Sequence, residues 1–253
     1  MLDGLGAPAA WAVMKRTGDA LQTRFTETKT NTADAERLRE RATKITTVED
    51  LLKDRRSLSV VLEAFQLEGE IDKKAILRKL MTEPLDDEKS FANRMADPRY
   101  TQLAAAFAGR SDAPLGSTAL VDSILQKAMV NRFEKASGDA NPGMRAALYF
   151  KRTIGAVTSI PQILSDKALT EVVRGGLGLP EQFGLLDYDK QKAILTRRLD
   201  PATFSDPKAM DRLTVRYLNQ VDSAAPTNPI LGLLSGGTGS MPGLLGQRVS
   251  FSV

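Results

Sequence analysis

The residues with the clearest chemical potential in this sequence are cationic and lie in two short stretches. Six of them form a candidate set for contacting nucleic-acid phosphates: Arg37, Arg39, Arg41, Lys44, Arg55 and Arg56. Glu36 and Glu40 alternate with the first arginines, which favours a solvated helix face with local ion pairs. Since 35 Lys and Arg are nearly matched by 31 Asp and Glu, nucleic-acid binding is the alternative hypothesis rather than the leading one.

Two residue types that carry much enzyme chemistry are missing, because the 253-residue chain has no histidine and no cysteine. Disulfides, thiolate nucleophiles, Ser-His-Asp hydrolysis and zinc catalysis through these ligands are therefore excluded. A Ser-Lys dyad or a carboxylate pair remains a third hypothesis, but the pattern singles out no residue for either role.

Three further stretches resemble functional motifs without matching them. The glycine-rich run 235–240 lacks the Lys-Ser/Thr of a phosphate-binding loop, and the run 175–184, interpreted as a loop between helices, lacks dinucleotide-binding spacing. The acidic stretch 200–211 lacks the ligand spacing and the closing Glu of a calcium loop. We therefore predict no catalytic residue, no metal site, no cofactor and no enzymatic activity.

The C-terminal segment 224–253 is rich in Gly, Pro and Ser and nearly without charge, so it is predicted to be a flexible tail. Its apolar pairs could dock on a protein partner or fold back onto the body. The candidate partner-binding residues are Ile230, Leu231, Leu233, Leu234, Leu244 and Leu245.

Helices are the elements that must position any site in this chain. Apolar residues recur at helical intervals, for example from Leu120 to Phe133, and Asp-Pro or Asn-Pro pairs mark several helix starts. Thr46 and Glu49 have the spacing of a capping box, and residues 131–141 are polar and interpreted as turn-rich. No hairpin or long β-branched alternation favours strands, so the predicted fold class is all-α.

A repeat organises these predicted helices. Residues 45–67 and 157–179 align without a gap at a constant offset of 112 positions. The identical pairs are Thr46/Thr158, Leu52/Leu164, Asp54/Asp166, Val60/Val172, Val61/Val173 and Leu67/Leu179. The sequence KAIL then recurs at 74–77 and 192–195. We predict an internal duplication with a first helical half at 1–109, a second at 117–223, a linker between them, and the tail.

The N-terminus does not resemble a signal peptide, because Asp3 precedes the apolar run and Lys15 and Arg16 follow it. No stretch approaches the roughly 20 apolar residues of a membrane-spanning helix. A cytoplasmic location is therefore expected, and the oligomeric state is not predicted.

Long ordered strings carry a family resemblance. Residues 141–180 (NPGMRAALYFKRTIGAVTSIPQILSDKALTEVVRGGLGLP) and 187–220 resemble the second half of a bacterial family of unknown function, common in alphaproteobacteria. Residues 48–68 and 90–109 resemble its first half, whereas residues 1–30 match poorly and Arg174-Gly175-Gly176 departs from the family pattern. Genes of this family often lie within flagellar gene clusters, and no catalytic residues carry over from it.

The resemblance implies a helical protein linked to flagellar assembly or function. The leading hypothesis is a non-enzymatic structural, chaperone-like or regulatory protein that acts through protein–protein contacts, with a flagellar component as the expected partner. The flagellar basal body, or export by the flagellar secretion route, is the alternative location.

Overall fold

Helices make up all the regular structure in the part of the chain that the structure describes. This computed structural model describes residues 2, 4–95 and 97–224, which form thirteen α-helices and four short 3₁₀ helices, with no strand. The α-helices are α1 (Ala7–Thr26), α2 (Lys29–Ala42), α3 (Val48–Lys53), α4 (Arg55–Ala64), α5 (Lys74–Thr82), α6 (Phe91–Arg94), α7 (Pro98–Phe107), α8 (Thr118–Ala140), α9 (Met144–Thr153), α10 (Ile160–Ser165), α11 (Lys167–Gly176), α12 (Tyr188–Arg198) and α13 (Pro207–Ala224). The 3₁₀ helices are Glu68–Glu70, Ile154–Ala156, Glu181–Leu185 and Pro201–Ser205. The predicted all-α fold class is confirmed.

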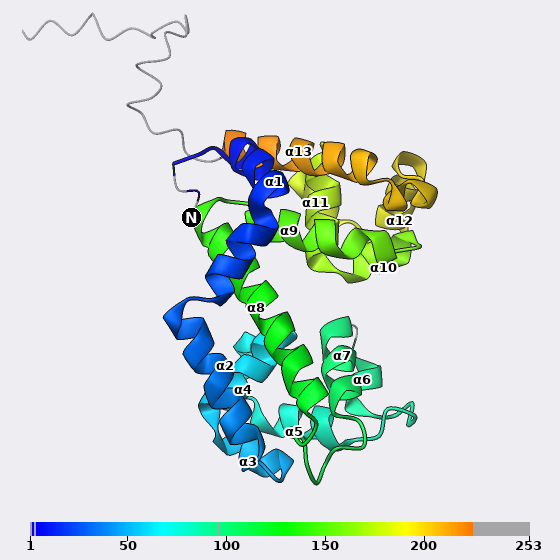
Figure 1. Ribbon diagram of the computed structural model, residues 1–253. Coiled ribbons are helices and arrows are strands. Elements are labelled where there is room, and N and C mark those ends of the chain that lie inside the picture. The colour runs from blue at the N-terminus through cyan, green and yellow to red at the C-terminus, as the bar shows by residue number, and fades with distance from the viewer. Residues whose placement is uncertain (1, 3, 96, 225–253) are drawn as a thin grey trace, which may run out of the picture.

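The helices form two lobes, each around its own apolar core (Figure 1). The first lobe contains α2 to α7 and the first half of α8, and its core includes Leu51, Leu62, Leu77 and Phe107. The second lobe contains α1 and α9 to α13. Residues Val121–Ala128 of α8 belong to the first core, and the rest of the helix runs on to α9. Helix α8 therefore connects the two lobes.

Helix α1 lies on the second lobe although it begins the chain. The Trp11 indole Nε1 donates to Asp211 Oδ1 on α13 at 2.9 Å, and the Lys15 ammonium lies 2.7 Å from Asp211 Oδ2. The backbone N–H of Ala7 donates to Asp222 at 3.2 Å. Each core therefore takes helices from both sides of residues 109–117, and the separate domains 1–109 and 117–223 stay a prediction.

The two halves of the sequence repeat form matching helix pairs. An offset of 112 positions carries α3 onto α10 and α4 onto α11, with the same bounds at both ends. Asp54 and Asp166, which are paired in the repeat, each cap the longer helix through backbone N–H groups. This agreement is local, and the internal duplication itself stays a prediction.

The sequence interpretation was wrong at three places, of which the first two concern α3 and α8. The capping box that starts α3 is formed by Thr47 and Asp50, and not by Thr46 and Glu49; the Thr46 hydroxyl donates to the Asp50 carboxylate instead. Residues 131–140 continue α8 rather than forming turns, because Asn131 and Glu134 face a buried polar interface. Polarity in this stretch indicates what the helix faces, and not where it ends.

Gly175 and Gly176 form the last turn of α11 and do not belong to a loop. A Cβ added to Gly175 would lie 2.6 Å from the Tyr217 ring, and one added to Gly176 would lie 2.6 Å from the Leu213 backbone oxygen. Because both neighbours are on α13, the glycine pair allows α11 and α13 to approach closely. This packing accounts for the small residues at these two positions.

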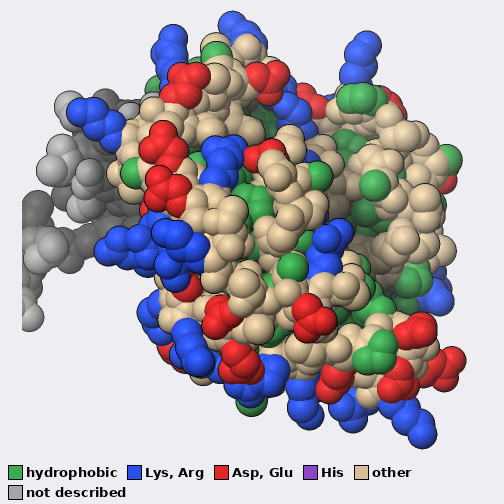
Figure 2. Space-filling view, turned by 60° about the horizontal axis from the view of Figure 1, so that its bottom comes forward, with side chains coloured by type: hydrophobic (Ala, Val, Ile, Leu, Met, Phe, Trp, Pro, Cys, Tyr) green, Lys and Arg blue, Asp and Glu red, His purple; other side chains and the backbone are tan. Residues whose placement is uncertain are grey.

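The surface of the first lobe mixes charges of both signs, with hydrophobic side chains in small separate groups (Figure 2). Within residues 2, 4–95 and 97–224, no helix has both the length and the apolar character needed to cross a membrane.

Candidate functional site: the cleft between the lobes

A cleft of about 1070 Å³ lies where the two lobes face each other. The first lobe contributes Gln66 and the start of α7, Asp97 to Arg99. The opposite wall comes from the last turns of α8, the start of α9, the α10–α11 corner, Tyr188 and Tyr217. The cleft thus depends on the tertiary arrangement, since no single segment supplies more than part of its wall.

Two tyrosine–carboxylate pairs line the second-lobe wall. The Tyr149 hydroxyl donates to Asp166 Oδ2 at 2.6 Å, and the Tyr217 hydroxyl donates to Glu171 Oε1 at 2.5 Å. Burial, followed by the hydrogen bond to the carboxylate, raises the pKa of both phenols well above the ordinary value. Both phenols therefore stay protonated at neutral pH and act as hydrogen-bond donors.

Asp166 is also engaged with the backbone. Its Oδ1 atom accepts from the N–H groups of Ala168 at 2.9 Å and Leu169 at 3.1 Å, which caps α11. Both oxygens of this carboxylate are thus satisfied by the protein. It is well placed to fix the wall of the cleft at the α10–α11 corner.

The first-lobe wall carries an arginine held in a fixed orientation. The Arg99 guanidinium contacts Asp97 through Nε at 3.0 Å and Nη2 at 2.5 Å, and its Nη1 donates to the Gln66 carbonyl at 2.7 Å. The hydrogen bond from Arg99 holds the pKa of the Asp97 carboxyl below its usual range. A planar guanidinium oriented in this way is suited to contacting carboxylates or backbone carbonyls of a ligand.

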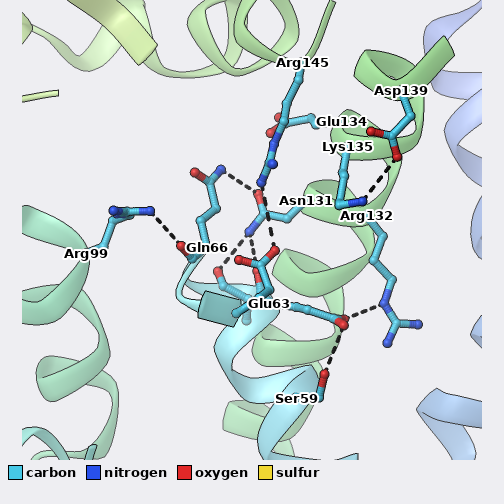
Figure 3. Close-up of polar contacts among 12 residues, drawn as sticks. Ser59, Glu63, Gln66, Arg99, Asn131, Arg132, Glu134, Lys135, Asp139 and Arg145 are labelled. Atoms are coloured by element: carbon cyan, nitrogen blue, oxygen red, sulfur yellow. Dashed lines mark hydrogen bonds and ion pairs between the residues drawn. The ribbon is translucent and has the colours of Figure 1, made fainter. Parts of the chain in front are cut away.

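A polar joint behind the cleft fixes the first lobe to α8 (Figure 3). Asn131, which is buried, donates from Nδ2 to the Glu63 carbonyl at 2.7 Å and the Ala64 carbonyl at 3.2 Å, at the end of α4. Its Oδ1 accepts from Gln66 Nε2 at 3.0 Å. Arg132 on the same helix contacts Glu63 at 2.5 Å and Asp34 at 2.8 Å, which ties α2 to this joint.

The joint continues to the second lobe through an ion pair between a buried carboxylate and a half-exposed arginine. The Glu134 carboxylate, whose side chain is 4% exposed, accepts from Arg152 on α9 through Nε at 2.9 Å and Nη2 at 3.2 Å. Burial raises the pKa of Glu134 even though Arg152 acts against it. The two lobes are therefore held at α8 by satisfied buried polar groups, and the cleft has firm walls.

None of the residues that the sequence analysis proposed for binding is among the described residues that line the cleft. Residues Ile230 to Leu245 of the tail are outside the described residues. Five of the six predicted cationic residues line an open hollow of about 480 Å³ on the first lobe, which we name the basic hollow; its lining is Arg37, Arg41, Lys44, Asp50, Lys53, Asp54, Arg55 and Arg56. Arg39 is not among them, because its guanidinium pairs with Asp122 on α8 at 3.0 Å.

Sequence reasoning missed the cleft. Asp166 was visible only as the repeat partner of Asp54, and Asp97 only as part of an Asp-Pro helix start. Nothing in the sequence pairs Tyr149 with Asp166 or places Arg99 opposite them. Within the described residues there is no group of three or more acidic side chains that could hold a metal ion.

The fold and the cleft together define a two-lobed, all-α protein with an open cleft between its lobes. The chain belongs to the family described as a protein of unknown function (DUF1217), which its residues 64–210 match. It is also similar to a solved structure, the crystal structure of protein AGR_C_984 from the alphaproteobacterium Agrobacterium tumefaciens, with a TM-score of 0.74 and 26% sequence identity over 88% of this chain and 96% of that chain. No curated protein matches the chain.

Proposed function

We propose that this protein is a non-enzymatic, flagellum-associated factor that binds a peptide segment of a partner protein in the cleft between its lobes. The observation that carries the proposal is the cleft itself. Its volume of about 1070 Å³ reaches the upper limit of ordinary small-molecule pockets, which is roughly 1,000 Å³. An open groove of this size with firm walls suits an extended polypeptide better than a small metabolite.

The lining supports a peptide ligand. Arg99 on one wall and the exposed Lys167 on the other provide cations, while Tyr188 offers an aromatic ring that is 50% exposed. Tyrosine and arginine are enriched in protein interfaces because they combine apolar area with hydrogen bonding. Leu185 and Leu186, next to Tyr188 in sequence, are 86% and 36% exposed and extend the apolar surface available to a partner.

The flagellar part of the proposal comes from the resemblance to a family whose genes often lie in flagellar gene clusters. The protein would then act in the cytoplasm, at the basal body or on the flagellar export route. The tail residues Ile230 to Leu245 are proposed as a second contact for the same partner.

The test is complementation of a gene deletion, scored by flagellar number and swimming. We expect the deletion to reduce swimming and the wild-type gene to restore it. The double variant Leu185→Asp with Tyr188→Ser changes the cleft lining at Tyr188 and the apolar surface beside it at Leu185, and it should fail to restore swimming. The control Leu5→Asp should succeed, because Leu5 is also exposed, at 43%, but belongs neither to the cleft lining nor to the segment 185–188.

The outcomes separate the two parts of the proposal. A deletion strain that swims normally would remove the flagellar role. Full complementation by the double variant would remove the cleft as the binding site. A pull-down with and without residues 224–253 measures the contribution of the tail, which is overturned if the captured partner and its amount are unchanged.

A further inference from the structure

The basic hollow concentrates the excess positive charge of the whole chain. The 253 residues carry a formal net charge of +4. The lining of the hollow contains six cations and two carboxylates, which is the same excess. The positive charges of the rest of the sequence are equal in number to its negative charges, so the hollow is a local excess of cations on the first lobe.

Both carboxylates in the hollow are already engaged by the protein. Asp50 accepts from the hydroxyls of Thr46 at 3.0 Å and Thr47 at 2.8 Å as part of the capping box. Asp54 caps α4 by accepting from the Ser57 N–H at 3.2 Å, and it also accepts from Arg41 Nε at 2.8 Å. These carboxylates orient the cations around them and leave much of the positive charge available to a ligand.

Several of the cations have no acidic partner of their own. Lys44, Lys53 and Arg56 are exposed, and none has an ion pair within the described part of the chain. Arg55 pairs with Asp72 at 2.5 Å, but both side chains are more than half exposed, so this pair is weak and replaceable. The Nε atom of Arg37 is buried without a hydrogen-bond partner.

The geometry points to a second interaction surface: we propose that the basic hollow binds a short acidic segment of a protein partner, through its carboxylates. A polypeptide with several Asp or Glu side chains can present them to cations that come from three different elements, the end of α2, the end of α3 and the start of α4. Charge complementarity of this kind accelerates association and gives specificity.

Nucleic acid fits this surface less well. Binding to a duplex requires a row of cations that follows successive phosphates. The arginines of α2 do not form one row, because Arg39 is two positions from Arg37 and Arg41 and therefore points to another side of the helix, toward Asp122 on α8. The remaining cations gather in one concave site of about 480 Å³.

The test is fluorescence anisotropy of the full-length protein with a labelled Glu-rich peptide, its Gln-substituted counterpart and a labelled duplex DNA. The variant is Lys44→Glu with Arg56→Glu, both exposed. The matched control is Lys192→Glu with Lys208→Glu, which makes the same charge change at exposed positions on the second lobe. Circular dichroism verifies that all variants fold.

We expect the wild type to bind the Glu-rich peptide, less tightly at higher salt, and the Gln-substituted peptide much more weakly. The hollow variant should lose at least about tenfold in affinity, and the control should change by less than about twofold. Equal binding of the two peptides, or equal loss in variant and control, would overturn the proposal. Tighter binding of the duplex that disappears in the hollow variant would assign the surface to nucleic acid instead.

This inference is independent of the cleft. Since the hollow is on the first lobe and the exposed Leu185 and Tyr188 are on the second, Leu185→Asp with Tyr188→Ser should leave peptide affinity at the hollow unchanged. Loss of that affinity in the cleft variant would contradict a separate surface.

Discussion

Gln66 and Gly178, 112 positions apart, both adopt the left-handed backbone conformation, with φ of 57° and 65°. Each follows the repeated helix pair, and each is followed by a buried leucine whose N–H bonds back to the helix: Leu67 to the Leu62 carbonyl and Leu179 to the Arg174 carbonyl, both at 2.9 Å. Both α4 and α11 therefore end in the same Schellman turn, one built with glycine and the other with glutamine.

The Schellman turn at Gly178 predicts that replacing this glycine by a residue with a side chain lowers the free energy of unfolding. A Cβ at this position would meet no atom within 4 Å, so the effect of Gly178→Ala comes from backbone conformation alone. We expect the free energy of unfolding to fall by about 1 kcal/mol, measured by urea denaturation. The control is Gly184→Ala, which has equal space and no positive φ. Equal effects of the two substitutions would contradict this explanation.

The close approach of α11 and α13 predicts a larger effect on stability for a substitution two residues earlier, at Gly176. In Gly176→Ala the new Cβ would lie 2.6 Å from the Leu213 backbone oxygen, which cannot move without displacing α13. We expect the free energy of unfolding to fall by about 2 kcal/mol, again from urea denaturation. Gly155→Ala, where no atom lies within 4 Å, is the control for the loss of a glycine. A variant as stable as wild type would show that the helices separate easily.

Local chemistry is what the sequence predicted well. Asp97-Pro98 was recognisable as a helix start because capping requires only a few neighbouring residues, and Asp54 and Asp166 were recognisable as repeat partners. The all-α class followed in the same way from helical spacing and the absence of strand signals. Each of these features is decided within one or two turns of chain.

The cleft could not be predicted because its parts meet only through the packing of the lobes. Arg99 and Tyr149 belong to α7 and α9, and nothing in their spacing relates them. Asn131 and Glu134 were misread for a related reason: a polar stretch inside a helix resembles a turn until the helices that bury it are known. Buried polar interfaces are a tertiary property, and periodicity alone does not reveal them.

The ion pair between the buried Glu134 and the half-exposed Arg152 predicts a pH-dependent loss of stability when the arginine is removed. In Arg152→Met the Glu134 carboxylate loses its charged partner, and we expect the free energy of unfolding at pH 7 to fall by about 3 kcal/mol. Burial already raises the pKa of Glu134 in the folded protein, and removing Arg152 raises it further. A carboxyl with a raised folded pKa favours folding when protonated, so the loss should shrink as the pH falls.

The measurement is urea denaturation of the variant and the wild type at neutral and mildly acidic pH. The control Lys135→Met removes the exposed partner of Asp139 and should change stability by less than about 1 kcal/mol at either pH. A loss in Arg152→Met that does not depend on pH would mean that packing of the arginine side chain, rather than the charge of Glu134, causes it.

Asn131 provides the last test, because its amide on α8 donates to two carbonyls at the end of α4 and so connects the two helices. In Asn131→Ala the Glu63 and Ala64 carbonyls at the end of α4 lose their side-chain donor in a place that water does not easily reach. We expect the free energy of unfolding to fall by about 2 kcal/mol. Asn93→Ala is matched in chemistry, since Asn93 Nδ2 also donates to two carbonyls, of Leu85 at 2.8 Å and Asp87 at 2.9 Å, but at an exposed position where water can replace it.

The comparison of the two asparagines decides whether the loss of unfolding free energy depends on the burial of the side chain or on the number of hydrogen bonds it donates. If burial decides, Asn131→Ala should cost at least about twice as much as Asn93→Ala in urea denaturation, since an unsatisfied buried acceptor loses its hydration as well as its partner. Asn131→Asp should be worse still at neutral pH, because a carboxylate would face the two carbonyls, and it should recover in acid, where the protonated side chain can donate again. Equal costs at positions 131 and 93 would mean that the joint is open to water, and the firm cleft walls that the proposed peptide binding requires would then lack their support.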